Sequence, residues 1–303
     1  MKRKLVKQGA STLMVSLPSK WIKENQLDKG SEIDLQIHNN ELTINASEKK
    51  QTYKEATIKI TTNTESAIRT ILTNAYRLGY DKIILTYSEP INIDIIKKTI
   101  NNNLLGYELT NTKKESCTIE NITEPSSEHA EKIFLKVLHG ISELINLVEQ
   151  QIQGKNKSQE IEEIEHKIKQ YDNFVRRTQS KSLKQASLQW LFHSQLIHAQ
   201  REIYMIYLFL KNNKLKVSNE TKKFYEKLKE IYETLKEGYL KKDTKILEKI
   251  HIMEKQIIYD SGYTLIEKIK GKENIINYRI ASSVRNFYLS SSPLLGIMLW
   301  QEH

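Results

Sequence analysis

The first 48 residues carry apolar side chains at every second position of two short stretches, which is the pattern of half-buried β-strands. The first stretch, residues 13–17, ends at Pro18, and the second, residues 33–44, is divided by a turn at Asn39-Asn40. Between them, residues 19–27 have the spacing of a short amphipathic helix that ends in a turn at Gly30. This helix would place three apolar side chains inward: Trp21, Ile22 and Leu27.

Residues 53–124 alternate strand patterns with segments that have the 3.6-residue period of a helix. We expect strands at ATIKIT and KIILTYS, helices at TESAIRTILTNAYRLGYD and NIDIIKKTINNNLLG, and one or two further strands after them. Thr64 or an Asn-Thr neighbour would cap the first helix, and Gly79 and Gly106 would end the two helices. This order of elements predicts a small α/β sandwich that links the regions on either side of it.

From residue 126 to residue 303 the helical period continues without a strand pattern. Long helices joined by short loops pack as antiparallel neighbours in a bundle. Six such helices divide into two three-helix units, which predicts a third, all-α domain. The expected helices are 127–153, 157–180, 184–212, 219–241, 243–270 and 272–301.

The composition narrows the class of protein. Only 10 Gly and 4 Pro in 303 residues fit long uninterrupted helices, and no apolar run reaches the length of a transmembrane helix. The single cysteine, Cys117, excludes an intramolecular disulfide, and the N-terminus lacks the apolar core of a signal peptide. We therefore expect a cytoplasmic protein without membrane insertion. The formal net charge of +10 favours an anionic partner.

Positive charge is concentrated near the N-terminus, where Glu24 is the single anion among residues 2–25. A unit of under 50 residues with neither metal ligands nor a disulfide buries too little apolar surface to fold well alone. We therefore expect a dimer, which would double the cations on one compact unit. A solvated surface is the plain interpretation of this charge, and contact with nucleic-acid phosphates is the functional one. The cations are Lys2, Arg3, Lys4, Lys7, Lys20 and Lys23.

The segment KRKLVKQGASTLMVSLPSKWIKENQLDKGSEIDL resembles the AbrB/SpoVT/MazE family of swapped-hairpin DNA-binding domains. The likeness lies in the strand into Leu17-Pro18, the helix with Trp21, and the Lys29-Gly30 turn. In that family two chains interleave their hairpins into one small β-barrel, and the first strand with its following loop faces DNA. The resemblance implies that Arg3, Ser11 and Thr12 could reach base edges. The DNA-facing positions carried over are Arg3, Lys4, Lys7, Ser11, Thr12 and Lys20.

The rest of the chain is similar to archaeal PhoU-like regulators, which join such a domain to a PhoU helical bundle. ILTNAYRLGYDKI and NNNLLGYELTN resemble the intervening domain, and EIEEIEHKIKQYDNFVRR and IHAQREIYMIYLF resemble the bundle. PhoU bundles bind metal through Glu/Asp-x-x-x-Asp motifs, whose two carboxylates share a helix face. Here each motif lacks its acidic partner, so we expect neither a family-type metal cluster nor a cofactor. The degenerate motif positions are Glu165, Lys169, Gln200, Tyr204, Tyr278 and Ser282.

Other chemical candidates have structural interpretations. Gly9 and the short polar residues after it fit a bulge in a strand, with a close approach to phosphate as the alternative. His193 and His198 have no carboxylate or cysteine at ligand spacing, so a packing or surface role is expected. The acidic residues Glu160, Glu162, Glu163 and Glu165 fit a solvated helix face, supported by lysines four residues after the last two, with weak cation binding as the minor alternative. Without a nucleotide-binding loop or a hydrolase motif, we do not expect an enzyme.

Together the patterns and the two resemblances predict a multidomain α+β protein. The resemblances imply a swapped-hairpin β-barrel over residues 1–48 and a PhoU-like bundle over 126–303, and the patterns predict an α/β sandwich over 53–124. We expect a DNA-binding transcriptional regulator, dimeric through its N-terminal domain. By resemblance it would act in phosphate uptake or a related nutrient response. The alternatives are a PhoU-like adaptor that docks a transporter or signalling protein on its bundle, and an antitoxin-like partner-binding protein. Bundle aromatic residues fit a core, with a ligand pocket between helices as the minor alternative.

Overall fold

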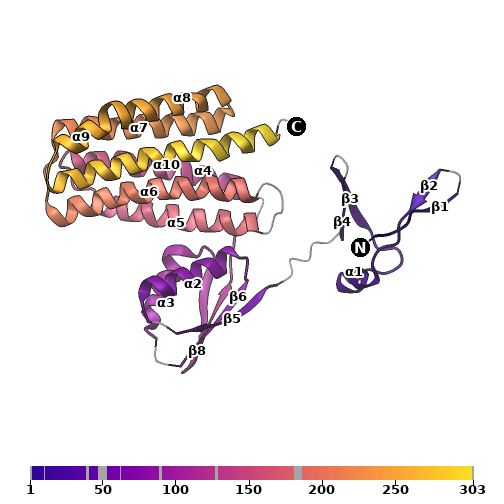
Figure 1. Ribbon diagram of the computed structural model, residues 1–303. Helices are drawn as coiled ribbons and strands as arrows, with labels where there is room; N and C mark the ends of the chain where they lie inside the picture. The colour runs from indigo at the N-terminus through magenta and orange to yellow at the C-terminus, as the bar shows by residue number, and fades with distance from the viewer. Residues whose placement is uncertain are drawn as a thin grey trace. The chain divides into compact units, whose positions relative to one another are not determined.

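The chain forms two compact units, residues 1–53 and residues 54–303 (Figure 1). The first contains short strands and a short helix, and the second contains a β-sheet and a bundle of long helices. The prediction of a multidomain protein with small sheets in its N-terminal part and helices in its C-terminal part is confirmed. The computed structural model describes residues 2–9, 11–38, 41–46, 53–61, 63–88, 91–126, 129–180 and 186–301.

The first unit is built from two antiparallel hairpins. Strand β1 (Val6–Gln8) pairs with β2 (Thr12–Met14), and β3 (Ile33–His38) pairs with β4 (Glu41–Ala46). Helix α1 (Ser19–Glu24) lies between the two hairpins along the chain. Within the described part of the single chain, the hairpins form two separate two-stranded sheets and no closed barrel.

Gly9 lies between two paired strands instead of within one. Its φ of +73° is a left-handed conformation, which glycine adopts without the strain of a side chain. Because Gln8 pairs with Thr12, Gly9 belongs to the loop of the first hairpin, and the predicted bulge is wrong. Gly30 has a similar φ of +94° in the predicted turn before β3. The predicted turn at Asn39-Asn40 lies outside the described residues.

The second unit begins with a mixed four-stranded sheet in the order β5-β6-β8-β7. β5 and β6 are parallel, whereas β8 pairs antiparallel with both β6 and β7. Helix α2 begins after Thr64 at the N-cap, and α3 begins after Asn92, whose side chain accepts a hydrogen bond from the Asp94 amide at 3.0 Å. The elements are β5 (Glu55–Ile60), α2 (Glu65–Arg77), β6 (Lys82–Tyr87), α3 (Ile93–Asn103), β7 (Tyr107–Thr112) and β8 (Ser116–Asn121).

Apolar residues of the sheet and of its two helices form one core. Every second residue of β6 is buried in it, as are Cys117 and Ile119 of β8, as the alternating pattern predicts. Cys117 belongs to this core on β8, where burial raises the pKa of its thiol to about 11. The large fully buried side chains of this core include Tyr76, Ile68, Leu72, Ile83 and Leu85.

Long helices make up the rest of the second unit and run side by side in Figure 1. Their buried apolar side chains form a second, larger core. In the described residues no helix has both the length and the apolarity needed to cross a bilayer. The helices are α4 (Ala130–Ile152), α5 (Ser158–Ser180), α6 (Ala186–Asn213), α7 (Asn219–Lys241), α8 (Thr244–Lys255), α9 (Tyr263–Lys268) and α10 (Lys272–Gln301).

The helix predicted over residues 243–270 is interrupted by a π-helical segment, η2 (Gln256–Gly262). Along α8 and η2, buried positions recur every fourth residue, from Ile246 through Ile250, Glu254 and Ile258 to Gly262. This spacing exceeds the 3.6 residues of an α-helical turn, so a regular helix would rotate these positions away from the core. The wider π turns keep them on the buried side.

Arg177 joins the bundle to the sheet region, where α2 and α3 contact α5. Its guanidinium is fully buried and donates to the Glu124 carboxylate at 2.7 Å and to the Asp81 carboxylate at 2.5 Å. It also donates to the carbonyl oxygens of Tyr76 and Tyr80, each at 3.0 Å. All three guanidinium nitrogens therefore have partners, and all four partners belong to the sheet region.

Candidate nucleic-acid interface

The first hairpin carries three of the residues predicted to face DNA: Lys7, Ser11 and Thr12. Lys7 is opposite Leu13 in the ladder, and Thr12 is opposite Gln8. Directly opposite residues of an antiparallel pair share a face, and successive residues alternate between faces. Lys7 and Thr12 therefore lie on opposite faces of the hairpin, and Ser11 lies in its loop.

The other candidates lie on either side of this hairpin along the chain. Arg3 and Lys4 are exposed in the segment before β1, and Lys20 is exposed on α1, where it faces Glu24 at 3.8 Å. Arg3, Lys4 and Lys7 form no ion pair within the described residues, so no carboxylate there competes with an external anion for them. The hairpin and its leading segment thus present three unneutralised cations close together in sequence.

The same unit also exposes much of its apolar surface. None of its described side chains is buried; Ile37 is 77% exposed and Leu13 is 60% exposed. The first hairpin is apolar on both faces, since Val6 and Met14 share one face while Leu13 lies on the other. Exposed apolar surface of this kind marks an interaction site. The further exposed apolar residues are Leu5, Val15, Leu35 and Leu42.

In the bundle, some of the degenerate metal-motif positions lie together and others do not. Glu165 is buried on α5 and pairs with Lys169 at 2.5 Å, and the Lys169 ammonium lies 5.9 Å from the centre of the Tyr204 ring. Burial and the nearby Glu165 raise the pKa of Tyr204 to about 12. The solvated face predicted for residues 160–165 is therefore wrong at Glu165, because its side chain points into the bundle.

The remaining motif positions do not complete a metal site. Gln200 is fully buried, and among the described residues neither atom of its side-chain amide has a hydrogen-bond partner. Tyr278 is 64% exposed, and Ser282 is half-buried. Over the residues that the structure describes, no group of three or more His, Cys, Asp or Glu side chains is placed to hold a metal ion.

His193 contacts residues of two other helices, α4 and α5, which its neighbours in the sequence do not indicate. It is buried on α6 and stacks on Phe134, with ring centres 4.2 Å apart and an interplanar angle of 11°. Its Nδ1 lies 3.7 Å from the carboxylate of Asp172 on α5, which also accepts a hydrogen bond from Arg176 at 2.8 Å. Burial, together with the Arg176 charge, holds the pKa of His193 well below its usual value, so the ring is neutral. His198 is exposed.

Comparison with protein families gives one match, over residues 6–54. The matching model is described as "Antidote-toxin recognition MazE, bacterial antitoxin". The comparison with curated proteins and the comparison with solved structures each gave no match. The matched range covers both hairpins and α1 of the first unit. The first unit, residues 1–53, is called the N-terminal module below. It is thus similar to MazE antitoxins, as its resemblance to the AbrB/SpoVT/MazE family predicts.

Proposed function

We propose that the protein is a cytoplasmic transcriptional regulator that binds double-stranded DNA as a dimer through its N-terminal module. The observation that carries this proposal is the group of unneutralised cations, Arg3, Lys4 and Lys7, on a module similar to MazE. Cations without intramolecular partners are free to neutralise phosphates and to release the counterions that surround DNA. Ser11 in the loop and Thr12 at the start of β2 supply hydroxyl groups, which can hydrogen-bond to base edges.

The exposed apolar side chains support the dimeric form. Two copies of the module would cover each other's hairpins and thereby build the core that a single copy lacks. A swapped-hairpin barrel is such an arrangement. It would also double the number of cations facing one duplex, so the strength of binding to DNA depends on the dimer.

DNA binding is tested by fluorescence anisotropy of the full-length protein on duplex DNA from its own upstream region and on a scrambled duplex. At three salt concentrations, we expect log affinity to fall steeply with log salt, by about 0.9 for each phosphate contacted. The Arg3→Ala/Lys4→Ala variant should bind more weakly and show a shallower slope. The matched control, Lys113→Ala/Lys114→Ala, removes the same charge from the turn between β7 and β8 and should bind as the wild type does. No binding at low salt by a folded dimer would refute the proposal.

Dimerisation is tested by sedimentation velocity of the full-length protein over a range of concentrations. We expect a dimer, and we expect Leu13→Lys/Leu35→Lys to be monomeric and to lose its affinity for DNA, because lysine cannot be buried in the shared core. Ile252→Lys changes an equally exposed residue on α8 and should leave the dimer intact. A wild-type protein that remains monomeric at micromolar concentration contradicts the dimer.

The process regulated would be phosphate uptake or a related nutrient response. This part of the proposal rests on the resemblance of the remaining chain to PhoU-like regulators. If DNA binding fails while the protein is folded and dimeric, the bundle becomes the functional part. The protein would then be an adaptor for a transporter or a signalling protein.

The MazE match favours a further alternative, an antidote that binds a toxin. Co-purification with the product of a neighbouring toxin-sized gene would distinguish that role.

A further inference from the structure

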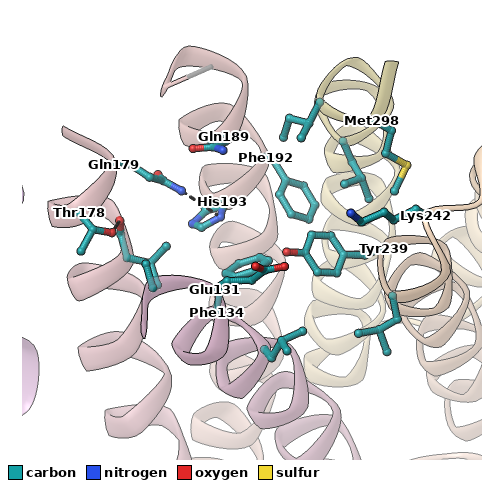
Figure 2. Close-up of a pocket in the computed structure, with 16 residues that line it drawn as sticks. Glu131, Phe134, Thr178, Gln179, Gln189, Phe192, His193, Tyr239, Lys242 and Met298 are labelled. Carbon is teal, nitrogen blue, oxygen red and sulfur yellow. Dashed lines mark hydrogen bonds between the residues drawn. The ribbon is translucent and has the colours of Figure 1, made fainter. Parts of the chain in front are cut away.

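A cavity of about 670 Å³ lies at one end of the helical bundle, where α4 and α6 begin and α5 and α7 end (Figure 2). The last turns of α10 form part of its wall. The volume is in the range of small-molecule sites, which are mostly apolar with a few polar groups that fix the orientation of the ligand. No residue predicted to bind DNA or metal lines it.

Four aromatic rings form part of the wall: Phe134, Phe192, His193 and Tyr239. Phe134 meets Phe192 edge-on with ring centres 5.8 Å apart, and it meets Tyr239 edge-on at 5.3 Å. Each ring therefore holds its neighbours in fixed orientations. Phe134, Phe192 and His193 are only 1–4% exposed, so among these rings it is the half-buried Tyr239 that can stack against a planar ring in the cavity.

Two glutamine amides supply the hydrogen-bonding groups. Gln179 donates to Nε2 of His193 at 3.4 Å, and its Oε1 is buried with no hydrogen-bond partner in the part of the chain that the structure describes (Figure 2). Gln189 lines the cavity on α6 and forms no hydrogen bond within the described residues. A buried acceptor without a donor costs free energy. A ligand that carries an N–H group would remove that cost.

The charges around the cavity do not favour an anion. The wall holds one carboxylate, Glu131, and one ammonium group, Lys242, and both side chains are exposed. His193 is neutral and therefore adds no positive charge. Because the single exposed lysine is balanced by a carboxylate, the side chains of the wall supply no net positive charge to a phosphate.

We propose that this cavity binds an uncharged planar heteroaromatic molecule of the nucleobase or nucleoside class. Such a ring stacks on aromatic side chains through its faces, and its edge presents alternating donors and acceptors that a glutamine amide can match. The polar amides disfavour a purely hydrocarbon ligand, whereas the neutral interior disfavours phosphate. This site is separate from the N-terminal module, so its test does not depend on DNA binding.

The test uses the full-length protein in isothermal titration calorimetry with adenosine and guanosine as probes. We expect at least one of them to bind, and inorganic phosphate and L-tryptophan not to bind. Gln189→Trp fills the cavity and should abolish binding, while Gln256→Trp, on the exposed side of η2, should leave it unchanged. Gln189→Leu keeps the size of the side chain and removes its amide, and should weaken binding about tenfold, the value of one hydrogen bond.

Circular dichroism verifies that each variant is folded. Nucleoside binding that is lost in Gln189→Trp and weakened in Gln189→Leu supports the proposal. Three outcomes would overturn it: no binding of either nucleoside, binding that persists unchanged in Gln189→Trp, or binding of L-tryptophan in place of the nucleosides. A failure here leaves the DNA-binding proposal untouched, since that proposal depends on other residues.

Discussion

Arg177→Ala is expected to lower the free energy of unfolding of the second unit by about 3–5 kcal/mol. The substitution removes a fully buried guanidinium that is paired with the carboxylates of Asp81 and Glu124, which are only 13% and 10% exposed. It also removes the guanidinium donor from the carbonyl oxygens of Tyr76 and Tyr80, which keep the Gly79 amide and the Tyr107 hydroxyl as donors. Removing one partner of a buried ion pair is costly because the other partner stays buried and charged.

Urea unfolding followed by circular dichroism measures this loss. Arg201→Ala is the matched control, because Arg201 is exposed on the neighbouring α6, and its change should be within about 0.5 kcal/mol. Arg177→Lys keeps the charge but lacks the planar fork that reaches several partners at once, so it should recover only part of the loss. A loss below about 1 kcal/mol in Arg177→Ala would show that this contact does not hold the sheet region to the bundle.

Gly106→Ala should be the second strongly destabilising change, at about 2–5 kcal/mol. Gly106 has a φ of +81°, which strains any residue with a side chain, and an added Cβ would lie 2.7 Å from the backbone of Glu124. Backbone at that distance must move, and Glu124 is a partner of Arg177. The two costs, strain and overlap, therefore add at this position.

Gly154→Ala separates these two costs. Gly154 has a similar φ of +93°, but an added Cβ there meets no atom within 4 Å. Only the conformational strain remains, at about 1–2 kcal/mol. The same urea experiment compares both variants. Equal losses would mean that Gly106 does not need its close contact with residue 124.

Local patterns in the sequence predict the helices and strands of the second unit well. The helix predicted over 157–180 is α5, and the one predicted over 219–241 is α7 with the same bounds. Periodicity and capping act within a few residues, so a single sequence contains this information. The sequence pattern does not predict the π-helical segment, because that segment depends on which residues must face the core of the bundle.

The buried polar residues could not be predicted in the same way. In the sequence Arg177 cannot be told from the many surface cations. Its burial depends on partners that lie about 50 and 100 positions earlier in the chain. His193 has its carboxylate partner, Asp172, on a different helix, so spacing along α6 gives no signal. The cavity likewise depends on five helices that meet at one end of the bundle. Residue types alone indicate the cations of the N-terminal module, but not which face of the hairpin each occupies.

The exposed apolar hairpin of the N-terminal module has a consequence for how the protein is made. The module leaves the ribosome before the 250 residues of the second unit, whose synthesis takes on the order of 12–50 s at roughly 5–20 residues per second. During that interval its apolar side chains cannot be covered by the rest of their own chain. In the proposed dimer, their cover comes from the same segment of a second nascent chain. Assembly between ribosomes on one messenger RNA would therefore protect the module from aggregation before either chain is complete.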